Sequence, residues 1–207
     1  MKAGNCRNYV SPETLVVPPA LQMKKFVAAA LVFILSVFLI GGALDENWEV
    51  KRQLTIKADA DRVHSFVADL KTWPDWTAWS RERDPDCVFT YSGTDFGKGM
   101  RYSWEGAELG KGHLTLTSAS IEEGVTFDLV FGVTDGTGDL AQGIFTYEDV
   151  DGDTLVTWTF FGEVDGAFGG WFALFMDLLA GAEFEKGLLG LQTLSEAELG
   201  DSLEEKG

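Results

Sequence analysis

The side chains that most often carry acid–base or metal chemistry are scarce in this sequence of 207 residues. It contains two histidines, His64 and His113, and two cysteines, Cys6 and Cys87. Structural zinc sites use clusters of Cys and His ligands at short spacings, and small disulfide-stabilised domains need several cysteine pairs. The sequence offers neither pattern, so we expect no metal site and no cofactor.

Motifs that would mark a reacting centre are also missing. His113 alternates with polar residues in the segment 111–120, which is typical of a solvent-facing row rather than of a general base. The acidic run 149–153 begins like a calcium loop, but Phe160 stands where an EF-hand has its last glutamate, so a hairpin turn explains the run better. No nucleophile elbow or glycine-rich phosphate loop occurs. We therefore assign no catalytic residue.

Aromatic residues are more informative than the polar ones. Three tryptophans cluster within the segment 73–79, where they suit either an aromatic lip that admits a ligand or a plug of the core. Bulky residues also alternate in the stretches 99–105, 124–133 and 154–163. Such rows build either a solid core or the wall of a cavity, and both interpretations stay open. We predict that six aromatic residues line a ligand site: Trp79, Tyr102, Trp104, Phe127, Trp158 and Phe175.

The elements that must position these residues follow from hydrophobic periodicity. Helical spacing predicts a helix at 60–70, a short turn or helix at 73–79 and a long helix from Trp171 to about Leu199, with Phe175, Leu178 and Leu188 on its apolar stripe. Tight turns between consecutive strands predict an antiparallel meander, and the lack of strand–helix alternation argues against a parallel sheet. Alternation predicts the strands 50–58, 87–92, 99–105, 111–120, 124–133, 143–150 and 154–163.

Together these elements predict an α+β fold in which a curved antiparallel sheet of about seven strands is covered by the long C-terminal helix. One transmembrane helix is expected to precede it. The organisation that we expect has four parts: a disordered N-terminal segment at 1–22, a transmembrane signal anchor at 23–44, the folded domain at 45–195 and an acidic C-terminal tail at 196–207.

Charge is distributed unevenly around the anchor. Residues 1–44 hold four basic residues and one acidic residue, a net charge of +3, whereas the rest of the chain holds 12 basic and 32 acidic residues, a net charge of −20. Residues 26–44 are 19 consecutive residues without a charge. At about 1.5 Å per residue, such a helix matches the ~30 Å hydrocarbon core of a bilayer. Lys24 and Lys25 precede it, so we expect a cytoplasmic N-terminus and an extracytoplasmic domain in the cell membrane.

The same segment allows a secreted product as an alternative. Gly41, Gly42 and Ala43 suit a signal-peptidase site, although the apolar run exceeds the core of about 7–15 residues in a signal peptide, which favours a retained anchor. Met23 followed by two lysines is a typical bacterial start, so translation from Met23 is a second hypothesis. The acidity of the domain argues against a nucleic-acid partner and predicts repulsion from anionic headgroups.

Several stretches resemble the SRPBCC superfamily, which includes START-like proteins and polyketide cyclase/dehydrase and lipid transport proteins, and in particular its bacterial membrane-anchored branch. They are 63–76 (VHSFVADLKTWPDW), 99–106 (GMRYSWEG), 156–159 (VTWT) and 184–188 (FEKGL). The resemblance covers roughly Trp48 to Leu194 and implies a helix-grip fold with a cavity between the sheet and the closing helix. Members hold hydrophobic molecules there, and some catalyse cyclisation or dehydration. No catalytic motif carries over residue by residue.

These observations predict a membrane-tethered domain that binds a lipid or another hydrophobic small molecule between the sheet and the C-terminal helix. Its partners would be that ligand and the membrane, without nucleic acid. Two alternatives remain open. The first is a cyclase or dehydratase that uses tyrosine or carboxylate acid–base groups in the same cavity. The second is a protein-interaction domain whose core is filled.

Overall fold

The computed structural model describes residues 19–134, 137–164, 166 and 168–204. The chain divides into two compact units, residues 1–40 and residues 41–207. Helix α1 (Pro19–Gly41) provides the described part of the first unit. Its 19-residue segment Met23–Gly41 has a mean hydropathy of 2.2. This helix is therefore long and apolar enough to cross a membrane.

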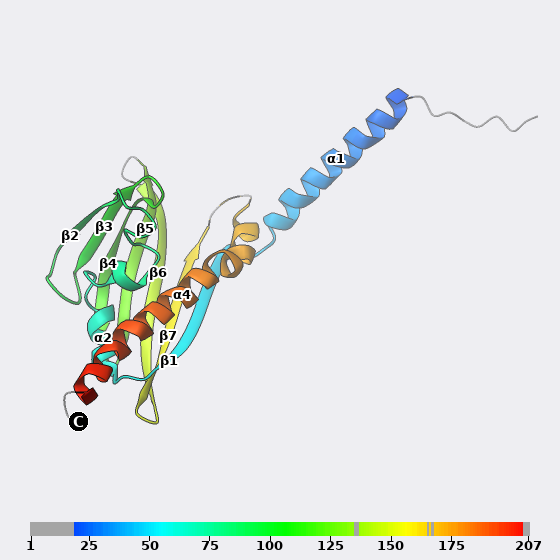
Figure 1. Ribbon diagram of the computed structural model, residues 1–207. Helices are drawn as coiled ribbons and strands as arrows, with labels where there is room; N and C mark the ends of the chain where they lie inside the picture. The colour runs from blue at the N-terminus through cyan, green and yellow to red at the C-terminus, as the bar shows by residue number, and fades with distance from the viewer. Residues whose placement is uncertain (1–18, 135–136, 165, 167, 205–207) are drawn as a thin grey trace, which may run out of the picture. The chain divides into compact units, whose positions relative to one another are not determined.

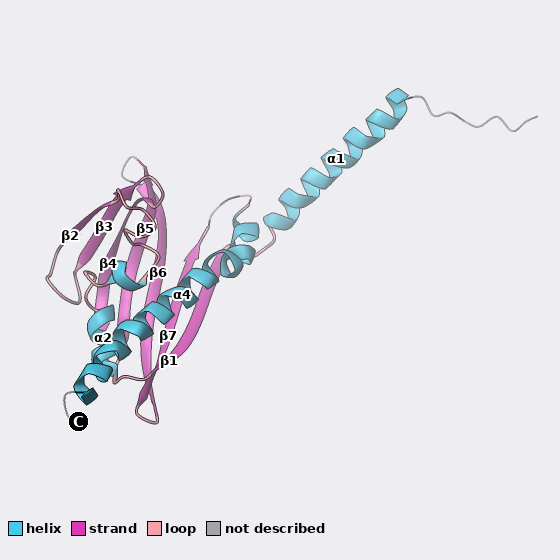
Figure 2. Cartoon of the chain, in the orientation of Figure 1, coloured by secondary structure: helices cyan, strands magenta, loops and turns pink. Residues whose placement is uncertain are grey.

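The second unit is built on one seven-stranded antiparallel sheet, as predicted (Figures 1 and 2). Strands β2 to β7 pair in chain order, and β1 pairs with β7, so the sheet order is β1-β7-β6-β5-β4-β3-β2. The strands are β1 (Asn47–Ile56), β2 (Val88–Ser92), β3 (Arg101–Gly106), β4 (Gly110–Ser120), β5 (Gly124–Thr134), β6 (Thr137–Val150) and β7 (Asp153–Glu163).

Local chemistry sets the turns of this meander. The hairpin between β6 and β7 places Asp151 at φ 57° and Gly152 at φ 91°, a left-handed pair that Asp and Gly tolerate well. The acidic run 149–153 is therefore a hairpin turn, which agrees with the sequence interpretation. β6 begins six residues before the predicted start at 143 because its pairing with β5 continues from Phe145 opposite Val125 as far as Thr137 opposite Thr134.

Three helices cover the inner face of the sheet. Helix α2 (Ala60–Val67) begins where the carboxylate of Asp59 accepts a 2.9 Å hydrogen bond from the backbone N–H of Arg62. Helix α3 (Trp73–Trp76) is one turn with a proline in its first positions. Helix α4 (Gly169–Glu204) continues without a break through Gly181 and runs past the predicted end near Leu199. In Figure 1, α4 crosses the face of the sheet.

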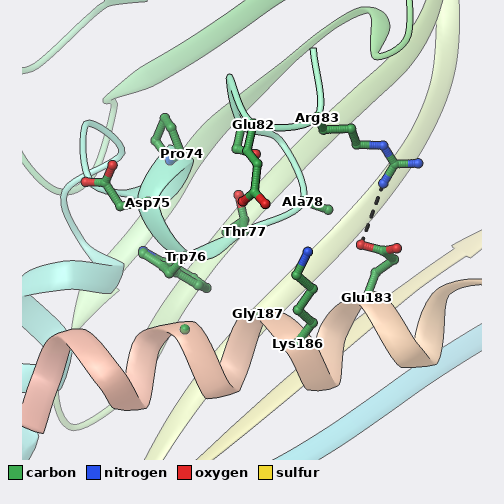
Figure 3. A pocket seen from close by; sticks show the side chains of 12 residues that line it. Pro74, Asp75, Trp76, Thr77, Ala78, Glu82, Arg83, Glu183, Lys186 and Gly187 are labelled. Carbon is green, nitrogen blue, oxygen red and sulfur yellow. Dashed lines mark ion pairs between the residues drawn. The ribbon is translucent and has the colours of Figure 1, made fainter. Parts of the chain in front are cut away.

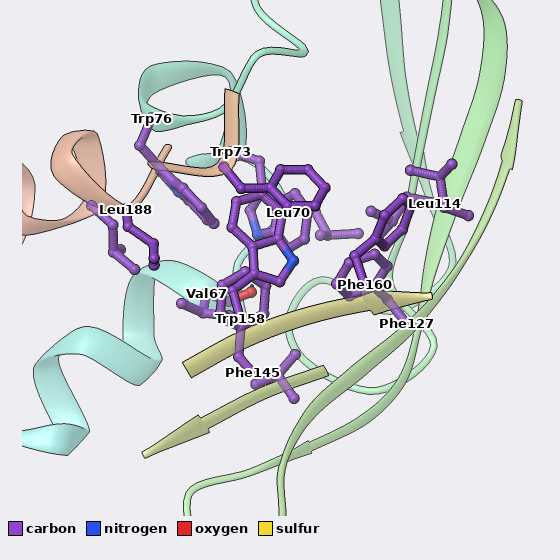
Figure 4. Close-up of a cluster of buried hydrophobic side chains, with 14 of the residues drawn as sticks. Val67, Leu70, Trp73, Trp76, Leu114, Phe127, Phe145, Trp158, Phe160 and Leu188 are labelled. Atoms are coloured by element: carbon purple, nitrogen blue, oxygen red, sulfur yellow. Dashed lines mark hydrogen bonds between the residues drawn. The ribbon is translucent and has the colours of Figure 1, made fainter. Parts of the chain in front are cut away.

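A solid aromatic core lies between the sheet and these helices. The indole of Trp158 in β7 stacks on Phe145 at a centroid distance of 4.8 Å (Figure 4). It also stacks on Phe184 of α4, at 4.3 Å. The Trp73 ring meets Phe127 edge-on at 5.3 Å. Position 143 must be glycine, because a Cβ atom there would lie 2.1 Å from the Phe127 ring. These contacts hold α3 and α4 on the same patch of the sheet.

An ion-pair cluster fixes α4 to the edge strand β1. The guanidinium of Arg52 donates to Asp177 over 2.7 and 3.2 Å, and its Nε donates to Glu185 over 2.7 Å. Asp177 and Glu185 lie eight residues apart on α4, so one arginine of the sheet contacts two points about 12 Å apart along the helix. These hydrogen bonds raise the pKa of Arg52 and lower the pKa of Asp177.

The apolar stripe predicted for α4 is covered by the core in its second part only. Leu188 and Leu191 are buried, at 2% and 0% exposure, whereas Phe175 and Leu178 are 48% and 78% exposed. The helix is apolar on all sides over its first turns, so periodicity there could not define which side faces the sheet. The buried side in that part contains Met176 instead.

Candidate functional site

An apolar pocket of about 340 Å³ opens between α4, the inner face of the sheet and the loop that follows α3. Ten of its lining residues are apolar. The three charged ones are Arg83 and Glu183, which are half-exposed, and Glu108, which is exposed. The apolar lining consists of Ala78, Trp79, Trp104, Leu109, Leu129, Phe131, Phe160, Leu179, Ala180 and Phe184. The interior of the pocket therefore offers hydrophobic contact rather than hydrogen bonds.

Hydrogen bonds from the sheet hold the tryptophans of this pocket in place. The hydroxyl of Tyr102 donates to the carbonyl oxygen of Trp79 over 2.9 Å, which ties the loop after α3 to β3. The Trp104 indole donates to the carbonyl oxygen of Leu109 over 3.2 Å. Trp79 and Trp104 then lie 6.0 Å apart, ring centroid to ring centroid. These bonds anchor the Trp79 backbone and the Trp104 ring at the wall of the pocket.

Asp84 is a structural residue of the site that the sequence interpretation missed. Its buried carboxylate, 3% exposed, accepts hydrogen bonds from the backbone N–H groups of Glu108 and Leu109, at 2.9 and 3.1 Å. These bonds hold the turn between β3 and β4, which supplies part of the pocket wall. In the sequence, the run Asp84-Pro85-Asp86 indicates only a loop. Nothing in it shows that Asp84 would bind backbone amides about 24 residues further along the chain.

A polar pocket of about 350 Å³ adjoins the apolar one and lies between α3, the loop after it and α4 (Figure 3). The two pockets share Ala78, Arg83 and Glu183. Arg83 and Glu183 form an ion pair of 3.6 Å that is marked in Figure 3. Lys186 extends from α4 toward the loop that carries Glu82. The helix and the loop after α3 therefore border an apolar compartment and a charged one that meet.

The six aromatic residues predicted to line a ligand site take three different places. Trp79 and Trp104 line the apolar pocket. Tyr102, Phe127 and Trp158 are at most 1% exposed in the core and do not line it. Phe175 lies on the exposed part of α4. The alternation of the strands identified the inner face, but the position at which α4 crosses that face decides which inward rings pack against the helix and which border the open space.

Four titratable side chains that burial affects, those of Tyr102, Tyr147, His64 and Cys87, do not line the apolar pocket. Burial raises the pKa values of Tyr102 and Tyr147, and the hydroxyl of Tyr102 is already bonded to Trp79. Burial lowers the pKa of His64, whose ring meets Tyr147 edge-on at 5.8 Å. Burial also raises the pKa of the Cys87 thiol. Among the described residues that line the apolar pocket, the acid–base groups are Glu108 and Glu183.

The fold agrees with a sequence comparison. The family model described as "Polyketide cyclase / dehydrase and lipid transport" matches residues 47–196. The chain belongs to this family. The match covers all seven strands and most of α4, and with them the residues that line both pockets. No curated protein matches the chain.

Solved structures share the fold of the second unit. The protein TTHA0849 from Thermus thermophilus is 19% identical, with a TM-score of 0.52 over 72% of this chain and 98% of that one. The protein CV1439 from Chromobacterium violaceum is 12% identical, with a TM-score of 0.51 over 72% and 97%. The hypothetical protein jhp0584 from Helicobacter pylori is 11% identical, with a TM-score of 0.51 over 71% and 87%. At these identities the likeness concerns the fold.

Proposed function

We propose that this protein binds a lipid or another hydrophobic small molecule in the apolar pocket under α4, while α1 tethers it to a membrane. The observation that carries the proposal is the pocket itself: its volume of about 340 Å³ falls in the usual range for small-molecule sites, and ten of its lining residues are apolar. Removing apolar ligand surface from water there would contribute roughly 25 cal/mol per Å². The family description, which includes lipid transport, supports the same conclusion.

The adjoining polar pocket favours an amphiphile over a plain hydrocarbon. An apolar chain among Trp79, Leu129 and Phe160 would leave its polar end near the shared residues Arg83 and Glu183, where the charged compartment begins. A polar headgroup placed there keeps its hydrogen bonds to water or to the ion pair, so it avoids the cost of burial without partners. Lys186 supplies a further positive charge in that compartment, which would suit a headgroup with an anionic part.

The tether follows from the charge distribution and from α1. The segment Met23–Gly41 meets the length and hydropathy of a membrane span. Lys24 and Lys25 near its start favour a cytoplasmic N-terminus and an extracytoplasmic domain. A tethered binding domain would sample lipids of its own membrane at high local concentration, which compensates for a modest affinity.

A filled pocket should abolish binding. Native mass spectrometry of the full-length chain released from phosphatidylglycerol nanodiscs should show one retained lipid. Ala180→Trp places an indole in the apolar pocket and should remove that mass. Ala182→Trp makes the same change on an exposed part of α4 that lines neither pocket, so it should retain the lipid. No bound lipid in the parent protein, or equal loss in both variants, would overturn the proposal.

A further inference from the structure

The first three turns of α4 carry apolar side chains that the domain does not cover. Phe172, Leu174, Phe175, Leu178 and Leu179 are 41%, 61%, 48%, 78% and 62% exposed. We call these five residues the α4 apolar surface. Single exposed leucines are ordinary, but large aromatic and aliphatic side chains gathered on one short helical segment mark an interaction site.

The place of this surface is fixed by the chain leaving α1. Helix α4 begins against the turn that follows Gly41, the last residue of α1, and all the residues in this contact belong to the second unit. A Cβ atom at Gly170 would lie 2.4 Å from the Leu44 Cβ and 2.7 Å from the Gly41 carbonyl oxygen, so no side chain fits between them. The chain therefore leaves α1 at a point, Gly41 to Leu44, that contacts the start of α4, and this holds for any direction of α1.

The charge pattern around the α4 apolar surface also suits lipid. Residues 166–176 contain no charged residue, in a domain whose net charge of −20 predicts repulsion from anionic headgroups elsewhere. The next charge, Asp177, is paired with Arg52 at 2.7 Å, so it is largely compensated. Leu178 lies eight residues beyond Gly170, or about 12 Å along the helix, which keeps the whole surface near the point of exit.

We propose that the α4 apolar surface inserts into the leaflet from which the chain emerges, so that the first turns of α4 lie among the lipids while the rest of the helix stays on the sheet. This inference rests on the membrane tether of the proposed function. Phenylalanine and leucine side chains on one helix are the residues that enter the acyl boundary of a bilayer when a helix lies in its plane.

The same surface reaches the ligand site. Leu179 belongs both to the α4 apolar surface and to the lining of the apolar pocket, and Ala180 and Phe184 continue that lining along the helix. An amphiphile leaving the leaflet would then pass along α4 into the pocket without exposing its apolar part to bulk water. The substrate class that fits this route is a membrane lipid taken from the adjacent leaflet, rather than a soluble hydrophobic molecule.

Spin labels can report the depth of this surface in a bilayer. The parent is the full-length chain with Cys6→Ser, in which the remaining Cys87 is 1% exposed and sets the labelling background. Leu174→Cys and Leu178→Cys test the surface in nanodiscs of phosphatidylethanolamine and phosphatidylglycerol. Val88→Cys is the matched control, because this 61% exposed residue lies on β2 at the other edge of the sheet. Val32→Cys in α1, 64% exposed, reports the anchor separately.

Spin labels at positions 174, 178 and 32 should be accessible to oxygen rather than to a water-soluble nickel complex, as expected in lipid. The label at position 88 should show the reverse. Adding Leu178→Glu should abolish the lipid signal at position 174, whereas Leu189→Glu, a change at a 54% exposed leucine further along α4, should leave it intact.

Three other results would overturn the inference. If the labels at positions 174 and 178 contact water while the label at position 32 contacts lipid, the tether and the ligand site are still supported, but the α4 apolar surface does not insert into the leaflet. Protection that occurs only when two copies share one nanodisc would assign the surface to a second copy of the chain. If the label at position 32 contacts water, the tether fails, and the insertion of the α4 apolar surface fails with it. Lipid retention by the parent chain would still test the ligand pocket separately.

Discussion

The two parts of α4 differ in how much of their apolar surface the sheet covers. From Gly181 onward, the helix buries Phe184, Leu188 and Leu191 against the sheet, and small residues allow close contact with the tryptophans. Before Gly181, the helix is more apolar, with Asp177 as its one charged residue, yet most of its large side chains are exposed. Composition is therefore a poor guide to burial along α4. The burial of each part of α4 depends on what it packs against. The second part packs against the sheet and, in our proposal, the first part packs against lipid.

The largest effect expected from this comparison concerns two phenylalanines of the same helix. Phe184→Ala removes a ring stacked on Trp158 and should cost about 3–5 kcal/mol of unfolding free energy. Phe175→Ala changes an exposed ring and should stay within about 0.5 kcal/mol. Urea unfolding of the full-length chain in a mild detergent measures both. Similar losses for the two variants would mean that the first part of α4 is packed after all.

A smaller effect should follow from the ion pairs at the junction of the two parts. Arg52→Gln removes the contacts to Asp177 and Glu185 and should lower the Tm at pH 7. The pKa of Asp177 is lowered by its bonds to Arg52, so the stability that this carboxylate contributes is present above the unfolded-state pKa of about 3.9. That stability is lost as the pH falls through the lowered folded-state value.

The difference in Tm between the parent chain and Arg52→Gln should therefore shrink in acid. Thermal unfolding followed by circular dichroism from pH 7 down to about pH 2 checks this. Arg83→Gln is the control, because the 3.6 Å pair between Arg83 and Glu183 joins two half-exposed side chains and should contribute less. A difference that stays constant with pH would assign the role of Arg52 to packing of its aliphatic stem rather than to charge.

The smallest effect on folding should come from the leucine with the greatest exposure on α4. Leu178→Ser should leave the unfolding free energy in detergent within about 0.5 kcal/mol of the parent value, because the side chain is 78% exposed. Chemical denaturation of the two proteins side by side is sufficient. A loss of several kcal/mol would show that Leu178 packs against the protein and would remove the contrast between the two parts of α4.

Much of the fold could be predicted from the sequence because each element carries its own local signal. Alternation in the strands and the Asp151-Gly152 turn each depend on neighbours close in the chain. The antiparallel order then follows, since short turns leave few other ways to pair the strands.

The site was harder to predict because it depends on contacts between distant elements. The sequence placed Trp79, Trp104 and Trp158 in one group, yet the position of α4 puts Trp158 in a stack with Phe184 and leaves the other two beside open space. Asp84 acts through backbone amides of another turn, for which a single sequence has no signal. The uncovered side of α4 was not predicted, because a helix that is apolar all round has no preferred phase.

The pairing of β1 with β7 has a consequence for the order in which the domain folds. Strands β2 to β7 each find their partner next in the chain, but β1 must wait for β7, since Asn47 pairs with Glu163. Closing so long a loop costs more chain entropy than closing a hairpin, so we expect β1 and β7 to pair more slowly than the hairpins form. A chain that emerges N-terminus first thus exposes the unpaired edge of β1 until more than a hundred further residues have followed, and α4, which packs on β1, can dock only after that.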